Sequence, residues 1–441
     1  MYFCSMFTKN QYVKLCGLFL LAVLLTTSCN RPEVVHCDDY RQAMRDFVVR
    51  ISETARAQTP DFIVIPQNGI ELVTVGEDAD AELAVPYLAA IDGHGQELFD
   101  SLPVIDKGEI LLLGEYHYLE EILSLEADVI KHTARLSQDT LEVFLELPYN
   151  LNYYIDRLFH HNDSISLLRY MKTLQSKVLE EYLRRSIFSI YGITLQHPKL
   201  RVFCVDANKS IYRFFFTLDM LFSNYSQAPE SIQSIRDFIR QIVRESPPKT
   251  ASEDAHLAKE LSVFQKHFKT HRKDYSNYLT GKDFFFVDKN LNNFSRTADE
   301  REELMYRNIS QQYKSHYKFI MITGVVHANK EKIQFTKKIY TPNAKPLAWK
   351  LNNNKKSPFF KKVYSICIAP QQLCFRDSKS NDSAPVEEMS MPFPTPQMPY
   401  AVKQELSKRN QAVTIMIMSK IKSPKPFDGY ILIRDAHSMI R

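Results

Sequence analysis

Residues 109–117 read EILLLGEYH, an apolar run that ends in a glycine, a glutamate and a histidine. The run 110–113 has the length and the continuous apolar character of a strand that is buried on both faces. Strands of this kind are typical of parallel sheets that helices cover on both sides. Ligands bind to such sheets just beyond the carboxyl ends of the strands. The segment therefore predicts a fold class, and it also predicts a site at Glu115 and His117.

Three more apolar runs have the same character, at residues 141–147 (LEVFLEL), 200–205 (LRVFCV) and 319–323 (FIMIT). Helical patterns lie between them, because apolar residues recur every three or four positions in 119–134. Alternation of strands with helices indicates an α/β fold. We expect a central, mostly parallel sheet that is flanked by helices.

The middle of the chain, residues 207–316, is expected to form a helical insertion or cap over one edge of the sheet. It contains an apolar stripe at helical spacing, formed by Ile232, Ile235, Ile239 and Ile242. Thr297 and Glu300 have the spacing of a capping box at the start of another helix. Residues 377–400, rich in serine, proline and methionine, are expected to form a disordered loop. The run YILIRDA at 430–436 is a candidate last strand.

The first 28 residues have the order of a signal peptide. Lys9 and Lys14 precede the apolar run 15–25, and small residues lead to Cys29. The run is shorter than the roughly 20 residues that a membrane-spanning helix needs. The stretch LLTTSC resembles the lipobox of bacterial lipoproteins, which implies that Cys29 carries the lipid and becomes the mature N-terminus. An ordinary signal peptide, with Cys29 incidental, is the alternative.

Removal of this segment leaves about 410 residues. We expect 29–104 to be a linker and lead-in segment and 105–435 to be the main domain. The expected location is the cell envelope, where the lipid anchors the protein to the membrane. The net charge of +5 becomes +3 without the two lysines of the signal peptide. This charge is too small to indicate a nucleic-acid partner.

The mature chain contains five cysteines, namely Cys29, Cys37, Cys204, Cys367 and Cys374. None of them forms a C-x-x-C pair, so a zinc–cysteine site is not indicated. Cys204 lies inside an apolar run and is expected to be a buried thiol. Cys367 and Cys374 could form a local disulfide in an oxidising compartment, but the sequence leaves this open.

Polar residues follow each predicted strand. Glu115 and His117 follow the first, and His327 follows the strand at 319–323 in the sequence GVVH. Glu146 lies near the end of an apolar strand, where an unpaired carboxylate would cost several kcal/mol to bury. Asp206 comes directly after another strand. All four strands therefore deliver a polar group at the same end.

A predicted helix supplies a cation for these carboxylates. Arg301 and Asn308 are spaced to share one face of the helix that follows Thr297. An arginine on that face could neutralise Glu115 or Glu146 through charge-assisted hydrogen bonds.

The ordered set of motifs resembles the superfamily that includes erythromycin esterases, the haem-uptake ChaN lipoproteins, and the TraB and Tiki proteins. The elements are LLLGEYH, VFLELP followed by YNLNYYIDRL, RVFCVDAN, REELMYRNI and MITGVVHANK, and later AKPLAWKL, KKVYSICI and FDGYILIRDA. They cover about residues 105–435. The E-x-H spacing of GEYH is more like that of the haem-uptake and Tiki branches than that of the esterases.

The resemblance implies roles for individual residues. Glu115 and His117 match the first catalytic or ligand pair, and His327 matches the second histidine. Glu146 matches the acidic residue of the second strand, while Arg301 and Asn308 match the polar face of the late helix.

A hydrolase of an ester or peptide bond is the leading hypothesis, because histidine titrates close to neutral pH and suits general-base catalysis. His117 or Glu115 would activate water, and His327 or Arg301 would stabilise charge. His117, Glu146 and His327 also form a possible ligand set for manganese, cobalt, zinc or iron. The sequence does not choose between metal-assisted and metal-free chemistry.

A binding lipoprotein without catalysis is the rival hypothesis. His117, His327 or the tyrosines beside His117 could then be axial ligands of a haem. A third hypothesis is a degenerate enzyme that serves as an interaction module, which the intact set of glutamates and histidines disfavours.

Overall fold

The computed structural model of the protein describes residues 62–67, 70–77, 81–91, 104–174, 176–245, 251–295, 297–332, 345–375, 389–392, 413–417 and 427–437. The signal peptide and Cys29 lie outside these ranges, as does most of the segment 377–400. No helix in the described part of the chain is long and apolar enough to cross a membrane.

Parallel strands form the centre of the fold. The whole sheet, parallel and antiparallel strands together, consists of β1 (Phe62–Gln67), β2 (Ile70–Glu77), β3 (Ala81–Ile91), β4 (Ile110–Glu115), β5 (Leu141–Pro148), β6 (Leu200–Asp206), β7 (Lys318–Gly324), β8 (Val363–Phe375), β9 (Met389–Pro392), β10 (Val413–Ile417) and β11 (Gly429–His437). Every neighbouring pair in the order β11-β8-β4-β7-β5-β6 is parallel. This arrangement confirms the α/β prediction.

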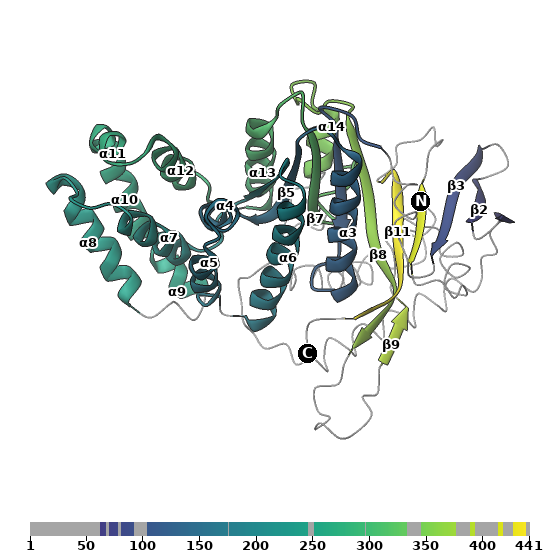
Figure 1. Ribbon diagram of the computed structural model, residues 1–441, viewed down its shortest axis with the longest axis horizontal. Helices are drawn as coiled ribbons and strands as arrows, with labels where there is room; N and C mark the ends of the chain where they lie inside the picture. Colours follow the sequence, from purple (N-terminus) through teal and green to yellow (C-terminus); the bar gives the residue numbers. More distant parts are fainter. Residues whose placement is uncertain are drawn as a thin grey trace, which may run out of the picture.

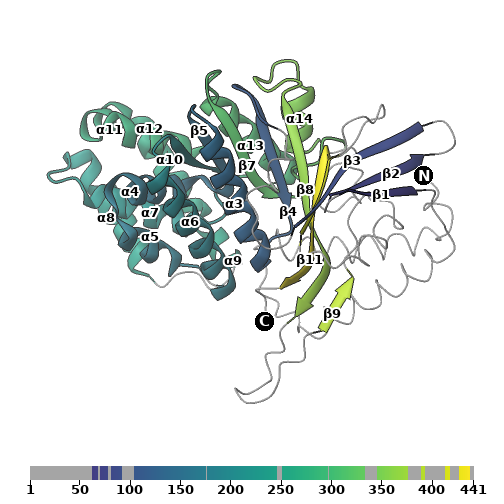
Figure 2. The same ribbon diagram turned by 45° about the vertical axis from the view of Figure 1, so that its right-hand side comes forward.

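Antiparallel strands extend the sheet beyond β11. There β10 pairs with β11 and β3, and β3 continues through β2 to β1. Figure 2 shows β1, β2 and β3 side by side at the right of the molecule. The lead-in segment expected at 29–104 therefore contributes strands to the sheet, which the linker prediction missed.

Alternate residues of the parallel strands pack on opposite faces, as the two-residue period of a strand requires. Leu111 and Leu113 of β4 belong to the core under helices α3 (Glu120–Leu136) and α6 (Lys177–Gln196). Ile110 and Leu112 face the other core, under α13 (Ala298–Gln312) and α14 (Leu347–Asn353). Helices on both faces explain why the strands are apolar throughout. Figure 1 shows α3 and α6 in front of the sheet.

A helical region lies to one side of the sheet, at the left of Figure 1. It contains α4 (Asn152–His161), α5 (Ser164–Met171), α7 (Ile211–Ser223), α8 (Glu230–Arg244), α9 (Ala251–His256), α10 (Ala258–Thr270), α11 (Arg272–Tyr278) and α12 (Gly281–Leu291). Apolar side chains of α4, α5, α7, α8, α10, α11 and α12 share one core, rich in tyrosine and phenylalanine. The predicted insertion at 207–316 is helical, but α4 and α5 belong to the same core and α13 packs on the sheet instead.

The helix-start prediction at Thr297 is confirmed. The Thr297 side chain accepts a hydrogen bond from the Glu300 backbone, and the Glu300 side chain accepts one from the Thr297 backbone. The isoleucine stripe of α8 is buried at all four positions. Local sequence patterns were therefore sufficient to predict the start of α13 and the buried face of α8.

The disulfide that the sequence left open is incompatible with the fold. Cys367 and Cys374 lie seven residues apart on the single strand β8. At about 3.3 Å per residue their Cα atoms are roughly 23 Å apart, whereas a disulfide needs less than about 7 Å. Cys204 is buried, as predicted, and burial raises the pKa of its thiol. Residues 389–392, inside the loop expected at 377–400, form β9 beside β8.

Candidate functional site

Glu115 and His117 form a carboxylate–imidazole pair at the carboxyl end of β4. The Nδ1 atom of His117 is hydrogen-bonded to Oε1 of Glu115, and the Tyr182 hydroxyl of α6 donates to the same oxygen at 3.0 Å. Tyr118 has a φ of 66°. This left-handed conformation is rare and strained for a residue with a side chain. The chain therefore turns sharply after His117, which holds the imidazole beside the strand end.

Glu146, at the end of β5, accepts hydrogen bonds from three directions. One carboxylate oxygen, Oε2, is bound by the Thr323 hydroxyl at 2.7 Å and by the Gly324 backbone N–H at 2.6 Å. The other, Oε1, is bound by the Arg301 guanidinium of α13. Burial alone would raise the pKa of Glu146, but His327 and Arg301 hold it well below its usual value. Glu146 is therefore a buried anion, and both of its carboxylate oxygens accept hydrogen bonds.

Arg301 links β5 to β6. Besides Glu146, it grips Asp206 with two hydrogen bonds of 2.7 and 2.8 Å, which is the fork geometry that arginine favours with carboxylates. Lys209 adds a second cation, 3.1 Å from Oδ2 of Asp206. Burial would raise the pKa of Asp206, but these two cations lower it to about 2. Arg301 was predicted to neutralise Glu115 or Glu146, and of these two carboxylates it is Glu146 that accepts its hydrogen bond.

His327 lies deeper than His117. Its side chain is 1% exposed, with Nδ1 hydrogen-bonded to Glu302 and Nε2 3.3 Å from Oε1 of Glu146. Burial would lower the pKa of this imidazole, but Glu146 and Glu302 outweigh burial and raise the pKa to about 9. The two buried carboxylates therefore favour the charged form of His327, against the opposing effects of burial and of the Arg301 guanidinium, which lies 3.2 Å from Nε2.

His117 is the more accessible of the two histidines, with a side chain 15% exposed. Burial disfavours its charged form, but the adjacent Glu115 and the more distant Glu146 outweigh this effect and raise its pKa. Its Nε2 atom lies 4.0 Å from Oε1 of Glu146. A Cβ atom at Gly324 would lie 3.0 Å from that Nε2, so the imidazole can pack at this distance only because residue 324 has no side chain.

A small cavity of about 70 Å³ opens onto this site. His117 and Glu146 line this cavity, and so do two cationic side chains, Lys209 and Arg213. The remaining lining is apolar or aromatic, from Tyr118, Leu147, Pro148, Leu151, Tyr170, Leu174, Leu179, Tyr182 and Leu183. Among the two histidines, only His117 borders the cavity, so it is the one that meets a ligand there.

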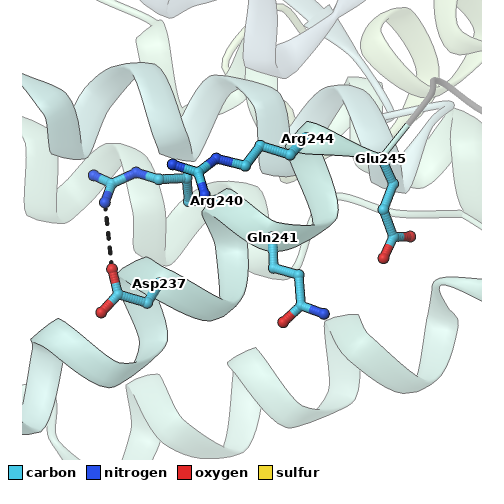
Figure 3. Close-up of a pocket in the computed structure, with 5 residues that line it drawn as sticks. All are labelled: Asp237, Arg240, Gln241, Arg244 and Glu245. Atoms are coloured by element: carbon cyan, nitrogen blue, oxygen red, sulfur yellow. Dashed lines mark hydrogen bonds and ion pairs between the residues drawn. The ribbon is translucent and has the colours of Figure 1, made fainter.

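A wider hollow of about 520 Å³ lies on the outer helix α8 (Figure 3). Its lining residues, from Asp237 to Glu245, project from one helix, and the drawn ion pair joins Arg240 to Asp237. Figure 1 places α8 at the far side of the helical region from the sheet. Open charged side chains on one helix do not form a catalytic site, so we place the chemistry in the smaller cavity.

A divalent metal does not fit the predicted ligand set in this arrangement. Arg301 contacts Glu146 and lies 3.2 Å from Nε2 of His327, so a guanidinium holds the positions that a cation would take. In the described part of the chain, no three His, Cys, Asp or Glu side chains are grouped to hold a metal.

A haem also fits poorly. Pockets that enclose most of a drug-sized ligand measure about 300 to 1,000 Å³, so the cavity of about 70 Å³ beside His117 holds only one part of a ligand. A porphyrin would need a cavity several times larger than the one that this histidine borders.

Sequence reasoning named Glu115, His117, Glu146, Arg301 and His327, and the structure brings all five together. Asn308 has a different place, because it donates to the Val205 carbonyl and to the Asn293 side chain. Sequence reasoning missed Tyr182, Glu302, Lys209 and Arg213. Glu302 carried a weak sequence signal, because it directly follows Arg301 in the predicted helix.

No family model and no curated protein matches the chain. Solved structures do resemble it. A crystal structure of a Bacillus cereus protein is 14% identical with a TM-score of 0.54, covering 80% of this chain and 96% of that one. A crystal structure of a succinoglycan biosynthesis protein is 10% identical with a TM-score of 0.50, covering 80% and 95%. At these identities the similarity supports the fold alone.

Proposed function

We propose that this protein is a hydrolase that cleaves an ester or peptide bond with a metal-free Glu/His site. The observation that carries the proposal is the His117–Glu115 pair at the cavity. The imidazole is bound through Nδ1 by a carboxylate, which orients the ring, while the ring itself borders the cavity. A carboxylate-oriented imidazole is the usual arrangement of a general base.

In the proposed reaction, Nε2 of His117 takes a proton from water as the water oxygen adds to the acyl carbon. The bond from that carbon to the leaving oxygen or nitrogen then breaks, and the imidazolium returns the proton to the leaving group. Lys209 borders the cavity and is the candidate to stabilise the negative charge that develops on the acyl oxygen. Arg301 and His327 act indirectly, because they hold Glu146 and Asp206 in place.

The order of motifs along the chain supports membership in the erythromycin esterase, ChaN and TraB–Tiki superfamily. We propose further that the protein is exported and anchored to the cell envelope through Cys29, with a small molecule or a peptide as its substrate. The sequence of the first 29 residues supports the export and the anchor.

The test is hydrolysis of a panel of chromogenic esters and peptides by the full chain and by His117→Asn. General-base catalysis contributes typically about 10²- to 10⁴-fold in rate, so His117→Asn should lose at least about 100-fold in kcat. His160→Asn is the matched control, because the His160 side chain on α4 is 71% exposed. It should keep the wild-type rate.

Two results would count against the proposal. One is a panel on which the wild type shows no turnover above buffer, with or without manganese, cobalt or zinc. The other is a His117→Asn variant that is as active as His160→Asn. If the wild type instead shows a Soret band after addition of haem, and His117→Asn abolishes it, the binding-lipoprotein hypothesis replaces the hydrolase.

A further inference from the structure

Two cationic side chains, Lys209 and Arg213, line the cavity beside His117, and they are not equivalent. Lys209 is paired with Asp206. Arg213, from the first turn of α7, forms no ion pair with any residue that the structure describes. Both side chains border the same cavity of about 70 Å³. Arg213 therefore brings to the cavity wall a positive charge that no carboxylate in the described part of the chain neutralises.

The position of Arg213 is defined by the residues around it. Its backbone N–H donates to Ser210, which begins α7. Burial raises the pKa of the Tyr170 hydroxyl and Arg213 opposes that rise, which places the guanidinium near this hydroxyl. Tyr170 also borders the cavity and is itself buried. The guanidinium is thus held against an aromatic wall, with hydrogen-bond donors left for a ligand.

Two carboxylates of the site, Glu146 and Asp206, are already paired with cations other than Arg213. Glu146 is bound by Arg301, and Asp206 is bound by Arg301 and Lys209. These ion pairs neutralise Glu146 and Asp206 without any contribution from Arg213. The cation that remains at the wall lies beside leucines, which favour the apolar part of a ligand.

We propose that the substrate carries an anionic group, a carboxylate or a phosphate, that Arg213 binds, and that its apolar part lies against the leucines of the cavity. This inference deepens the hydrolase proposal and rests on it for the reacting bond. The substrate class is then an ester or amide of an acid with a second, charged group. Leu147, Leu174, Leu179 and Leu183 form the apolar wall.

The experiment compares two chromogenic esters, para-nitrophenyl hexanoate and mono-para-nitrophenyl adipate, which differ by one terminal carboxylate. A hydrogen bond to a charged group is worth about 10- to 100-fold in affinity. Arg213→Met should therefore lower kcat/KM for the adipate ester by about that factor, mainly through KM, and change the hexanoate ester by less than about twofold. Arg213→Lys should recover part of the loss, and Arg169→Met, at an exposed position of α5, should behave as wild type.

A binding arm separates this inference from the hydrolase proposal. Thermal shifts of the full chain are measured with hexanoate, hexyl phosphate and hexanol. If either anion raises the melting temperature of the wild type and Arg213→Met abolishes this shift, the anion site is supported even when no ester is cleaved. The anion that gives the larger shift identifies the group that Arg213 binds. Three results would overturn the anion site: the same loss of anion stabilisation in Arg169→Met as in Arg213→Met, a thermal shift with hexanol as large as with the anions, or turnover of both esters at the same kcat/KM.

Discussion

The charge on His327 should make the stability of the protein depend on pH. The imidazole is buried between Glu302 and Glu146, and its pKa is about 9 in the folded state. The ordinary pKa of histidine is 6.5. A group whose pKa is higher in the folded state stabilises the protein fully below its unfolded pKa, and loses this effect as the pH rises through the folded pKa. The window for His327 is therefore pH 6.5 to 9.

The magnitude follows from the two pKa values. Each pKa unit corresponds to about 1.4 kcal/mol, so the difference between 6.5 and about 9 is worth about 3 kcal/mol of unfolding free energy. Full burial of the side chain means that solvent screens little of this. The comparison variant is His327→Gln with Glu302→Gln, which replaces the charged pair by a neutral pair and leaves no single charge unpaired.

Urea unfolding, followed by circular dichroism at several pH values between 6 and 10, measures the effect. The difference in stability between wild type and the double variant should fall by about 3 kcal/mol from the acidic to the alkaline end. His160→Gln with Asp156→Asn is the control, because this pair is 3.7 Å apart on the surface. An exposed pair contributes about 0–1 kcal/mol. Parallel pH profiles for wild type and the buried double variant would refute a charged His327.

Three further predictions concern other parts of the protein. Gly324→Ala should displace His117 by a few tenths of an ångström, because its Cβ would lie 3.0 Å from Nε2. Turnover should fall about 10-fold, since misplacements of 1 Å can cost about 100-fold, while Gly192→Ala, with open space around it, should keep the wild-type rate. Arg301→Met should destabilise the fold by about 3–5 kcal/mol in urea unfolding, because it leaves two buried carboxylates without their guanidinium; an unchanged midpoint would contradict this. Cys29→Ser should move the protein from the membrane fraction to the soluble fraction, and unchanged fractionation without a lipid-sized mass difference would argue against the anchor.

The strand ends could be predicted from the sequence because the relevant information is local. An apolar run that ends in a glycine or in a polar residue indicates where a buried strand stops, and parallel strands stop at one edge. Glu115, Glu146, Asp206 and His327 were placed correctly on this basis alone. Strand pairing then brings them together without any further signal.

The contacts between elements could not be predicted in the same way. Tyr182 reaches Glu115 from a helix 67 positions further along the chain, and nothing in its neighbourhood marks it as different from other aromatic residues. Arg213 is one of several basic residues on amphipathic helices, and only the folded structure shows that it lines the same cavity as the end of β5. The strand β8 was also missed, because Pro370 and the two glutamines that follow it interrupt its apolar pattern.

The most direct test of the central claim is the pH dependence of kcat/KM for wild type and Glu115→Gln on the best ester of the panel. A general base must be neutral to act, and Glu115 is the leading cause that raises the pKa of His117 against the effect of burial. Wild-type activity should therefore rise with pH through a value above the ordinary 6.5 of histidine. In Glu115→Gln the rise should move to lower pH, with a lower plateau because the imidazole is less well oriented. Profiles with the same midpoint in both proteins would contradict a Glu115–His117 base.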